Sequence, residues 1–562
     1  MVEKIWLEHY EEGVPHDLQI EPKTIPQYVA ETVERFPDVV ASRFMGGSLT
    51  YRELDLQAER FAAVLASFGV GKGSRVALNL PNCPQFMIAY YGALRLGAIV
   101  VLCNPLYTGR ELTQQLDDAG AEIVLTLSRF YPIVRNIKEK TKVKTIIATS
   151  IKEYLPAGLR LLYTLFQEKK EGDRVKLQPG DYWLQGLLRR ADGPPPAVEL
   201  KHDDVACILY TGGTTGLAKG ALLTHRNLAA NALQIKSWLT DLKEGDEIGM
   251  AVLPFFHSYG MSTCLNLSLL VGGTLVLVPR FTQEEILKLI HRERPTLMPG
   301  VPTLYIAIIN APNLKKYDLS SIRVCISGAA PLPREVQDRF EALTGGRLRE
   351  GYGLTETSPV THCNPIYGRS KAGSIGVPFP GTEAKIVDLT DPAAELPAGE
   401  IGQLAIRGPQ VMKGYLNQPE ETAAVFHDGW FLTGDIGKRD EDGYFYIVDR
   451  EKDMIIAGGY NIFPREIEEV LYSHPKIKEA CAAGIPHSYR GETVKAYIVL
   501  REGEEMDEAE VRKFCEENLA RYKVPKAVEF RDELPKTMVG KVLRRALIEE
   551  ERARGEKKGS AG

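Results

Sequence analysis

The sequence carries little net charge and no cysteines at the spacing of a redox or zinc motif. Its 69 basic and 74 acidic side chains leave a formal charge of −5 over 562 residues, which argues against a dedicated nucleic-acid-binding protein. The eight cysteines are scattered, with no C-x-x-C pair and no Cys/His cluster at zinc spacing. This usage favours a reducing, cytoplasmic compartment and the absence of a structural metal.

The sequence also has little that indicates a signal peptide or a membrane-spanning helix. The N-terminal residues lack the basic and apolar regions of a secretory signal peptide, so we expect none. Residues 248–279 contain no Asp, Glu, Lys or Arg, but Pro254, Asn266 and the pair Gly272-Gly273 interrupt the apolar run. A spanning helix needs ~20 predominantly apolar residues in one run. We therefore predict a buried loop, a buried helix and a strand here.

What the chain does contain is a repeated alternation of helix and strand signals. Apolar residues at helical spacing in 49–70 are followed by a strand signal in 74–80, and the alternation continues to residue 127. A second round of strand signals runs from 206 to 332. This alternation is typical of parallel sheets covered by helices, so we predict an α/β fold. The length is too great for one core and indicates at least two domains.

The pattern changes in the last third of the chain. Short strand signals joined by turns such as Asp442-Gly443 indicate an antiparallel β unit, and a smaller α/β pattern begins after Asp449. We therefore predict a large N-terminal domain over 1–449, built of helix-covered parallel sheets plus a β unit. A small C-terminal α/β domain over 450–562 follows, and its last residues, from Glu549, are predicted to form a charged, solvated tail.

Residues 155–166 stand apart from this alternation. Leu155, Leu159, Leu162 and Phe166 fall on one helical face, and basic residues follow near the end of the helix. One interpretation is a helix packed on the body of the protein. The other is an interfacial helix that makes the protein peripheral on the inner face of a membrane.

The stretch LYTGGTTGLAKG, residues 209–220, has the composition of a phosphate-binding loop. Its glycines let phosphate oxygens approach the backbone, and its hydroxyls and lysine add donors and charge. These residues are Thr211, Gly212, Gly213, Thr214, Thr215, Gly216 and Lys219. It departs from the Walker pattern G-x-x-x-x-G-K-[ST] because Gly220 stands where the metal-binding hydroxyl should follow the lysine. Any metal needs another ligand. Taken alone, the stretch is equally consistent with a strand-to-helix turn capped by threonines.

Three further stretches carry side chains suited to a nucleotide. In EGYGLTETSP, residues 350–359, Tyr352 can stack on a purine and Glu356 is a hard oxygen ligand of the kind that the loop lacks. Asp435 follows a Thr-Gly turn, where a carboxylate can accept both ribose hydroxyls. Lys541 stands on a turn near the end of the chain. Each of these residues, taken singly, is also consistent with an ordinary turn or a solvated surface.

Five stretches follow one another in a fixed order: YTGGTTGLAKG, YGLTE, DGWFLTGDIG, VDREKDMIIAGGYN and PKTMVGK. Together they resemble the adenylate-forming superfamily of acyl-CoA synthetases, peptide-synthetase adenylation domains and luciferases, over nearly the whole chain. With GPQVMKGYLNQP they are most similar to bacterial long-chain fatty acid–CoA ligases. The resemblance implies that Mg²⁺, ATP, coenzyme A and a fatty acid bind. It also implies two steps, the formation of an acyl-adenylate with release of pyrophosphate and its thiolysis with release of AMP.

The resemblance also implies the residues of the nucleotide site. The loop from Thr211 to Lys219 would hold the β- and γ-phosphates, and Glu356 with Thr211 would hold Mg²⁺. The residues implied to contact adenine, the α-phosphate and ribose are Gly328, Ala329, Ala330, Tyr352, Gly353, Thr355, Asp435 and Arg450.

The resemblance implies a catalytic lysine and a mobile small domain. Lys541 would stabilise the charge that gathers during adenylation, and losing such a group costs on the order of 10²–10³ in rate. Rotation of the small domain at the hinge Lys452 would withdraw Lys541. It would bring Gly458, Gly459 and Tyr460 to the coenzyme A channel. His257, in PFFHSYG, matches a gate or wall of the acyl pocket, although a lone histidine among apolar residues is otherwise a satisfied core residue.

The motifs do not identify the carboxylic acid that is the substrate. Apolar burial contributes ~0.8 kcal/mol per CH₂, so one side chain in the pocket, which residues 300–303 are predicted to line, can set the chain length. A medium-chain or aryl acid–CoA ligase is an alternative, as is an enzyme that loads a carrier protein. A non-enzymatic binder is disfavoured because Lys541 and Glu356 are both present. The sequence carries no signal for the oligomeric state.

Overall fold

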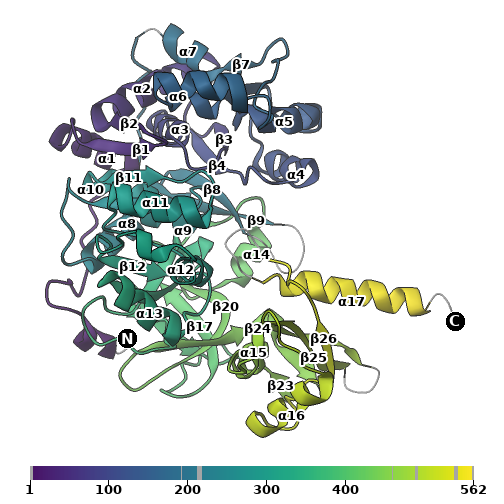
Figure 1. Cartoon of the computed structure of the whole chain (residues 1–562). Helices are drawn as coiled ribbons and strands as arrows, with labels where there is room; N and C mark the ends of the chain where they lie inside the picture. Colours follow the sequence, from purple (N-terminus) through teal and green to yellow (C-terminus); the bar gives the residue numbers. More distant parts are fainter. Residues whose placement is uncertain are drawn as a thin grey trace. The chain divides into compact units, whose positions relative to one another are not determined.

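A computed structural model describes residues 4–191, 193–211, 218–457, 460–487, 491–536 and 542–559. Its contacts divide the chain into two units, both drawn in Figure 1. The first unit runs to Glu383 and includes Arg407–Phe431, and the second comprises Ala384–Ile406 and continues from Leu432. The domain boundary between residues 449 and 450 stays a prediction.

The first unit contains an eight-stranded sheet of order β18-β9-β8-β4-β3-β5-β6-β7. Its strands are β3 (Arg75–Asn79), β4 (Ile99–Leu102), β5 (Ile123–Leu127), β6 (Thr145–Thr149), β7 (Tyr182–Trp183), β8 (Val205–Thr211), β9 (Lys219–Thr224) and β18 (Gly414–Tyr415). The six strands from β8 to β7 pair in parallel, whereas β9 and β18 are antiparallel additions at one edge. The predicted parallel α/β fold is confirmed.

The other strands of this unit form two four-stranded groups, β10-β11-β1-β2 and β12-β13-β14-β15. Their bounds are β1 (Val40–Phe44), β2 (Gly47–Thr50), β10 (Ile248–Ala251), β11 (Thr274–Leu277), β12 (Val324–Ser327), β13 (Arg347–Gly353), β14 (Val360–Cys363) and β15 (Val377–Pro378). Leu297 bridges to both Gly249 and Val324 in parallel, so the chain around Leu297 joins the two groups.

Helices cover these sheets. They are α1 (Ile25–Arg35), α2 (Tyr51–Ser67), α3 (Pro84–Arg95), α4 (Gly109–Ala119), α5 (Tyr131–Ile137), α6 (Ala157–Leu162), α7 (Leu184–Arg190), α8 (His225–Trp238), α9 (Ser258–Gly260), α10 (Leu267–Val271), α11 (Gln283–Glu293), α12 (Pro302–Ile309), α13 (Arg334–Thr344) and α14 (Pro419–Ala424). Contacts link α1, α2, α3, α8 and α10, while α4 packs on α5 (Figure 1). Helix α2 begins at a capping box in which the Thr50 amide donates to Glu53 at 2.8 Å, and it buries Leu54, Phe61 and Leu65.

The charge-free stretch 248–279 forms a loop, helical segments and a strand in the first unit, as predicted. After β10 a loop leads to α9, a π-helical segment at Met261–Asn266 and α10, and the chain then enters β11. Every residue from Ser258 to Val278 is buried. Over the described ranges, no helix combines the length and the apolar character that crossing a bilayer requires.

The second unit contains two sheets. One is five-stranded and is built from β16 (Glu383–Val387), β17 (Gly402–Arg407), β19 (Phe426–His427), β20 (Trp430–Arg439) and β21 (Phe445–Arg450), with β20 and β21 antiparallel as predicted. The other has the order β23-β22-β25-β24, with β26 beside β25. Its elements are β22 (Ile455–Ala457), β23 (Tyr460–Ile462), α15 (Pro464–Tyr472), β24 (Ile477–His487), β25 (Gly491–Leu500), α16 (Glu508–Asn518), β26 (Ala527–Phe530) and α17 (Arg544–Gly559).

The charged, solvated tail from Glu549 stays a prediction, although its first residues are helical. Residues Arg544–Gly559 form helix α17, and its acidic side chains pair with cations of the same unit. Lys495 Nζ lies 2.6 Å from Glu551, and the Arg531 guanidinium lies 2.6 Å from Glu550. These ion pairs connect the helix to its own unit, while Glu549, Glu550 and Arg554 remain exposed.

Two histidines are buried in the first unit. His225, the first residue of α8, is 1% exposed, and its Nδ1 has no hydrogen-bond partner within the described ranges. Burial lowers its pKa to about 4. His362 on β14 is 0% exposed, and burial lowers its pKa to about 3. Both rings are neutral in the folded protein near pH 7.

These histidines predict a loss of stability in mild acid. An unfolded histidine takes up its proton near pH 6.5, so the unfolded state gains protons first as the pH falls from 6.5 towards 4. In urea unfolding followed by tryptophan fluorescence, the wild type should lose about 2 kcal/mol more between pH 7 and pH 5 than the His225→Leu variant. Replacing the exposed His16 by Gln should leave the wild-type slope unchanged. Equal slopes for the wild type and His225→Leu would contradict the prediction.

Candidate active site

The predicted phosphate loop connects β8 to β9, two antiparallel neighbours of the eight-stranded sheet. Thr211 and Lys219 are register partners, and the Thr211 hydroxyl donates to the Lys219 carbonyl at 3.4 Å. The predicted loop residues between them, which are Gly212, Gly213, Thr214, Thr215 and Gly216, lie outside the described residues. The pairing therefore fixes both ends of the loop at one place on the sheet.

Glu356 lies beside this hairpin. It belongs to a short 3-10 helix, η8 (Thr355–Thr357), which contacts β8 and β9. The Tyr415 hydroxyl donates to Glu356 Oε1 at 2.8 Å, and the Met412 amide donates to the Glu356 carbonyl at 2.7 Å. Burial and then the charge of Glu356 hold the pKa of Tyr415 well above its usual range. The Tyr415 hydroxyl therefore keeps its proton near pH 7 and remains a hydrogen-bond donor to Glu356.

Lys219 completes a connected cluster with these residues. Its Nζ lies 5.1 Å from the centroid of the Tyr415 ring and is ion-paired with Glu421 on α14. Sequence reasoning missed Tyr415 and Glu421. Tyr415 stands in GPQVMKGYLNQP, which resembles the family but assigns no chemistry to this tyrosine. Only the pairing of β18 with β9, which sets Tyr415 opposite Ala221, shows the connection.

The predicted adenine segment follows β12. The Gly328 amide donates to the Gly300 carbonyl at 3.1 Å, and Ala329 adopts a left-handed φ of +67°. A Cβ at Gly328 would lie 3.0 Å from the Tyr259 ring, whose hydroxyl donates to the Ile326 carbonyl at 2.7 Å. A larger residue at this position would require the Tyr259 ring to shift, so glycine favours this close approach. The next residue of the predicted segment, Ala330, is part of the same loop.

Tyr352 and Gly353 end β13 directly before η8. The half-buried Tyr352 ring meets His362 edge-on, with 5.9 Å between ring centroids. The register of β13 with β14 shifts between Tyr352 and Gly353, so the chain leaves the sheet at this point. The predicted purine-stacking tyrosine therefore ends a strand, and the predicted metal ligand Glu356 lies in the short helix that follows it.

His257 lies near η8, because its neighbour Ser258 contacts that helix. The Ser258 hydroxyl lies 3.4 Å from the Thr355 hydroxyl, which brings the start of α9 next to η8. His257 Nδ1 accepts a hydrogen bond from the Tyr259 amide at 3.2 Å, and burial lowers the pKa of the ring to about 4. The imidazole is neutral near pH 7. Its role as a gate or pocket wall stays a prediction.

The residues around η8 are suited to a magnesium ion that comes with a substrate. Throughout the described part of the chain, no three or more His, Cys, Asp or Glu side chains gather in a group that could hold a metal. Mg²⁺ usually keeps several waters and is bound through one or two carboxylates together with substrate phosphates. The Glu356 carboxylate, held by Tyr415 beside the strand that ends at Thr211, fits this mode.

The predicted ribose residues belong to the second unit. Asp435 on β20 and Arg450 on β21 are register partners, and Arg450 Nε lies 3.2 Å from Asp435 Oδ1. Lys452 follows in the short helix η9 (Glu451–Asp453), and Tyr460 begins β23. The remaining predicted residues, Gly458, Gly459 and Lys541, lie outside the described residues.

The chain is similar to known proteins over nearly its whole length. Residues 29–416 match the family model for AMP-binding enzymes, and residues 466–541 match that for the AMP-binding enzyme C-terminal domain. A long-chain-fatty-acid–CoA ligase of Bacillus subtilis is 48% identical over 553 residues, which cover 98% of each chain. One from Salmonella typhimurium is 38% identical over 99% of this chain and 100% of its own. The crystal structure of ATP-bound MatB from Rhodopseudomonas palustris aligns with a TM-score of 0.83 and 32% identity over 94% of this chain and 99% of MatB.

Gly353 generates a prediction about the loop that carries Glu356. A Cβ added at Gly353 would lie 2.0 Å from the Pro359 carbonyl oxygen, so the backbone of the loop must move. The Gly353→Ala variant should lose about 1–3 kcal/mol of unfolding free energy in urea denaturation, as for an overpacked core. Gly71→Ala is the control, because an added Cβ there meets nothing within 4 Å. If the two variants were equally stable, the close packing at Gly353 would be wrong.

Proposed function

This chain belongs to the family of AMP-binding enzymes, and we propose that it ligates long-chain fatty acids to coenzyme A at the expense of ATP. The cluster of Lys219, Tyr415 and Glu356 at the ends of the β8–β9 hairpin carries the proposal. It sets a cation and a hard carboxylate beside the loop that is expected to hold phosphates. Relatives that carry the name long-chain-fatty-acid–CoA ligase match almost the whole chain.

The proposed reaction has two steps. A carboxylate oxygen of the fatty acid attacks the α-phosphorus of ATP, and the bond to pyrophosphate breaks, which yields an acyl-adenylate. The thiol sulfur of coenzyme A then attacks the acyl carbon, its proton is lost, and AMP leaves. The first step is needed because a carboxylate oxygen is a poor leaving group, whereas AMP is a much better one.

The residues of the first unit bind the nucleotide in this proposal. Lys219 and the loop hydroxyls face the β- and γ-phosphates, and Glu356 with Thr211 would hold the metal. Bound Mg²⁺ supplies positive charge that offsets the charge of the phosphates. The Tyr352 ring and the backbone of residues 328–330 face the adenine, while Thr355 donates to the α-phosphate.

Residues of the second unit bind the ribose and move between steps in this proposal. The Asp435 carboxylate, oriented by Arg450, accepts the ribose hydroxyls. Lys541 stabilises the charge that gathers between the carboxylate and the α-phosphate. Rotation about Lys452 then exchanges Lys541 for residues 458–460, which admit the thiol arm. The neutral ring of His257 can form part of an apolar acyl pocket without burying a charge.

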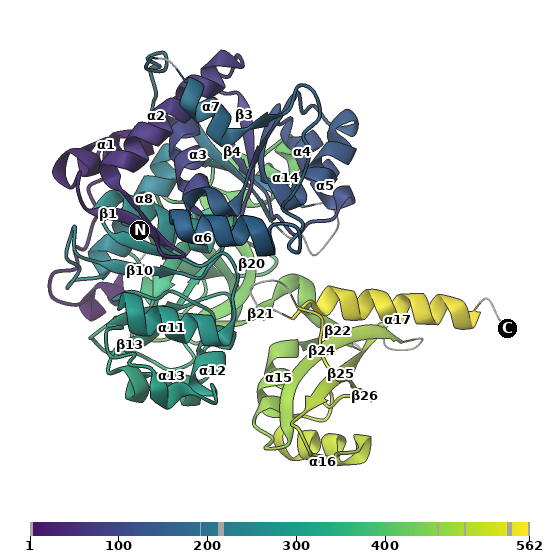
Figure 2. The ribbon, with the colours of Figure 1, turned by 45° about the horizontal axis from the view of Figure 1, so that its top comes forward.

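We also propose that residues 155–166 touch a membrane surface. Leu155 is packed at 8% exposure, so the predicted face is buried at its start, but α6 and the π-helical turn after it expose their apolar side chains. The exposed fractions are 47% for Leu159, 60% for Leu161, 52% for Leu162, 65% for Leu165 and 69% for Phe166. Such a contiguous apolar set, on a helix that faces the viewer in Figure 2, is typical of an interaction site.

Polar contacts hold this helix on the body, so its apolar side is left outside. The Tyr163 hydroxyl bonds to Asp173 and accepts from Arg129 at 3.3 Å. Lys152 Nζ donates to Thr164 at 3.2 Å and to Glu168 at 2.7 Å. A helix fixed through its polar side in this way presents its leucines to the surroundings, as interfacial helices do.

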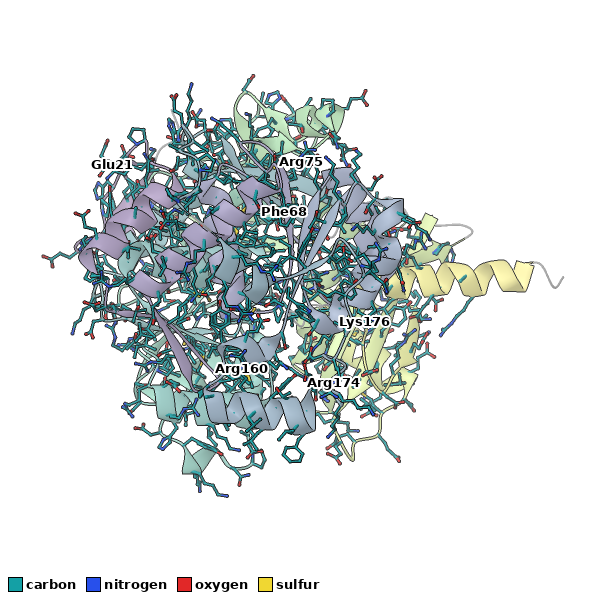
Figure 3. The ribbon with its side chains drawn as sticks, turned by 90° about the horizontal axis from the view of Figure 1, so that it is seen from above. Glu21, Phe68, Arg75, Arg160, Arg174 and Lys176 are labelled. Atoms are coloured by element: carbon teal, nitrogen blue, oxygen red, sulfur yellow. The ribbon has the colours of Figure 1, made fainter. Side chains whose placement is uncertain are left out.

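Cations flank the apolar side chains and fit an anionic lipid surface. Arg160, Lys169, Lys170, Arg174 and Lys176 are exposed on or just after the helix. Figure 3 labels Arg160, Arg174 and Lys176, and Arg174 donates to the Thr164 carbonyl at 3.4 Å. Long-chain acids dissolve in bilayers, so contact with a bilayer would bring the enzyme to its substrate.

The ligase proposal predicts thioester formation that depends on ATP, Mg²⁺ and the length of the acid. With free coenzyme A and saturated acids of increasing length, the rate should be highest for long chains, and AMP and pyrophosphate should be released. Each added CH₂ in an apolar pocket contributes ~0.8 kcal/mol, so two carbons should change kcat/KM about fifteenfold until the pocket is full.

Lys541→Ala is the control for this assay. It should bind ATP but lose adenylate formation by a factor on the order of 10²–10³. A rate maximum at medium-chain or aryl acids would overturn the long-chain assignment. Adenylate without thioester would indicate that a carrier protein is the acceptor.

The membrane proposal predicts co-sedimentation with vesicles that contain phosphatidylglycerol. Changing Leu161 and Leu165 together to Asp should lower the partition coefficient at least about tenfold, because burying each leucine contributes roughly 1.5–3 kcal/mol. Leu106→Asp is the matched control, since Leu106 is 61% exposed at another place on the surface. Equal binding of the double variant and the wild type would refute the membrane contact.

A further inference from the structure

We infer that Tyr415 is a positioning residue that sets both the metal-binding carboxylate of Glu356 and the ammonium of Lys219 for the phosphates of ATP. This inference rests on the proposed function. Tyr415 itself does not need to touch a substrate, because it acts through the two charged groups that it contacts.

The first contact fixes the carboxylate. The Tyr415 hydroxyl donates to Glu356 Oε1 at 2.8 Å, and the ring is 9% exposed. Without a partner, the carboxylate group of a glutamate can rotate about the bond that joins it to the side chain. A hydrogen bond from a buried hydroxyl restricts this rotation and fixes the orientation of the two carboxylate oxygens. Partners that orient a metal ligand in this way commonly change metal affinity or activity by 10- to 100-fold when removed.

The second contact guides the lysine. Lys219 Nζ lies 5.1 Å from the Tyr415 ring centroid, within the range of a cation–π interaction. Its ion pair with Glu421 holds the ammonium from the other side. One aromatic ring therefore carries a hydroxyl towards the metal ligand and a π-face towards the lysine that ends the phosphate loop.

The backbone of Tyr415 is fixed well enough to serve this purpose. Tyr415 pairs with Ala221 across β18 and β9, and its amide donates to the Thr422 hydroxyl at 2.9 Å. The ring is thus tied to the strand that begins at Lys219 and to α14, which carries Glu421. A change in the position of Tyr415 would therefore alter its contacts with both Glu356 and Lys219.

The buried tyrosines of this unit make two kinds of contact. The hydroxyls of Tyr51, Tyr259 and Tyr305 donate to backbone carbonyls, a use that satisfies a buried polar group without involving a charged side chain. Tyr415 instead bonds to a side chain of the candidate site. Tyr91 and Tyr131 likewise donate to carboxylates, those of Asp55 and Asp181, so Tyr415 is distinguished by the place of its partner, Glu356, in the candidate site.

The test is the Mg²⁺ dependence of ATP–pyrophosphate exchange with a long-chain saturated acid. Tyr415→Phe keeps the ring over Lys219 and removes only the hydroxyl. It should raise the Mg²⁺ concentration at half-maximal rate about tenfold, with KM for ATP at saturating Mg²⁺ unchanged. Tyr415→Leu removes both contacts and should raise the Mg²⁺ midpoint and KM for ATP together.

Two controls separate positioning from simple loss of stability. Tyr91→Phe removes the hydroxyl of another buried tyrosine, which bonds to the Asp55 carboxylate at 3.1 Å, and it should leave the Mg²⁺ midpoint at the wild-type value. In a Glu356→Gln background, Tyr415→Phe should add no further effect, because the carboxylate that it orients is gone.

An unchanged Mg²⁺ midpoint in Tyr415→Phe would overturn the inference, as would an undiminished effect in the Glu356→Gln background. Failure of the proposed function gives a different result, in which the wild type exchanges pyrophosphate with none of the acids. In that case, calorimetry of ATP binding at several Mg²⁺ concentrations compares Tyr415→Phe with the wild type without turnover. Weaker Mg²⁺-dependent ATP binding by the variant would support the inference, and equal binding would overturn it.

Discussion

The antiparallel pairing of β9 with β8 and β18 is the constraint on which the rest of the candidate site depends. It closes the loop between Thr211 and Lys219 and sets Tyr415 two residues along from the lysine on the neighbouring strand. A slip of one residue in a strand turns every side chain to the opposite face. Such a slip would move Lys219 away from the Tyr415 ring and would separate the hairpin from η8.

The same strand pairing also gives partners to the charged side chains of Lys219 and Glu356, which lie in a half-buried site. Removing Lys219 and Glu356 from water is costly unless each has a partner. Glu421 and the Tyr415 ring share the lysine, and the Tyr415 hydroxyl bonds to the glutamate. An incoming polyphosphate would offer the lysine a denser negative charge than one carboxylate. The lysine can therefore be stabilised in the free protein and still be available for a phosphate.

Ion pairs in the second unit bear on the proposed hinge. The half-buried Arg544 guanidinium lies 2.5 Å from Asp453 and 2.8 Å from Glu468. Asp449 accepts hydrogen bonds from the amides of Arg450 and Arg465, both at 2.7 Å. The chain on either side of Lys452 is thus fixed by side chains of its own unit. If the small domain turns at Lys452, as proposed, the change in backbone angles would be confined to a few residues.

The sequence by itself determined the kinds of elements in this protein. Apolar periodicity identified the parallel strands and their covering helices, because the burial of one face repeats with the period of the element. Glycine, threonine and lysine types indicated the phosphate loop, and the order of five motifs indicated the family. The tertiary structure decided which side chains meet. Tyr415 and Glu356 are 59 residues apart, and Lys219 and Glu421 are 202 residues apart, so no local pattern links them. Helix α17 likewise pairs with residues that are distant in the sequence, Lys495 with Glu551 and Arg531 with Glu550, because ion pairs between segments depend on how the strands are arranged in space.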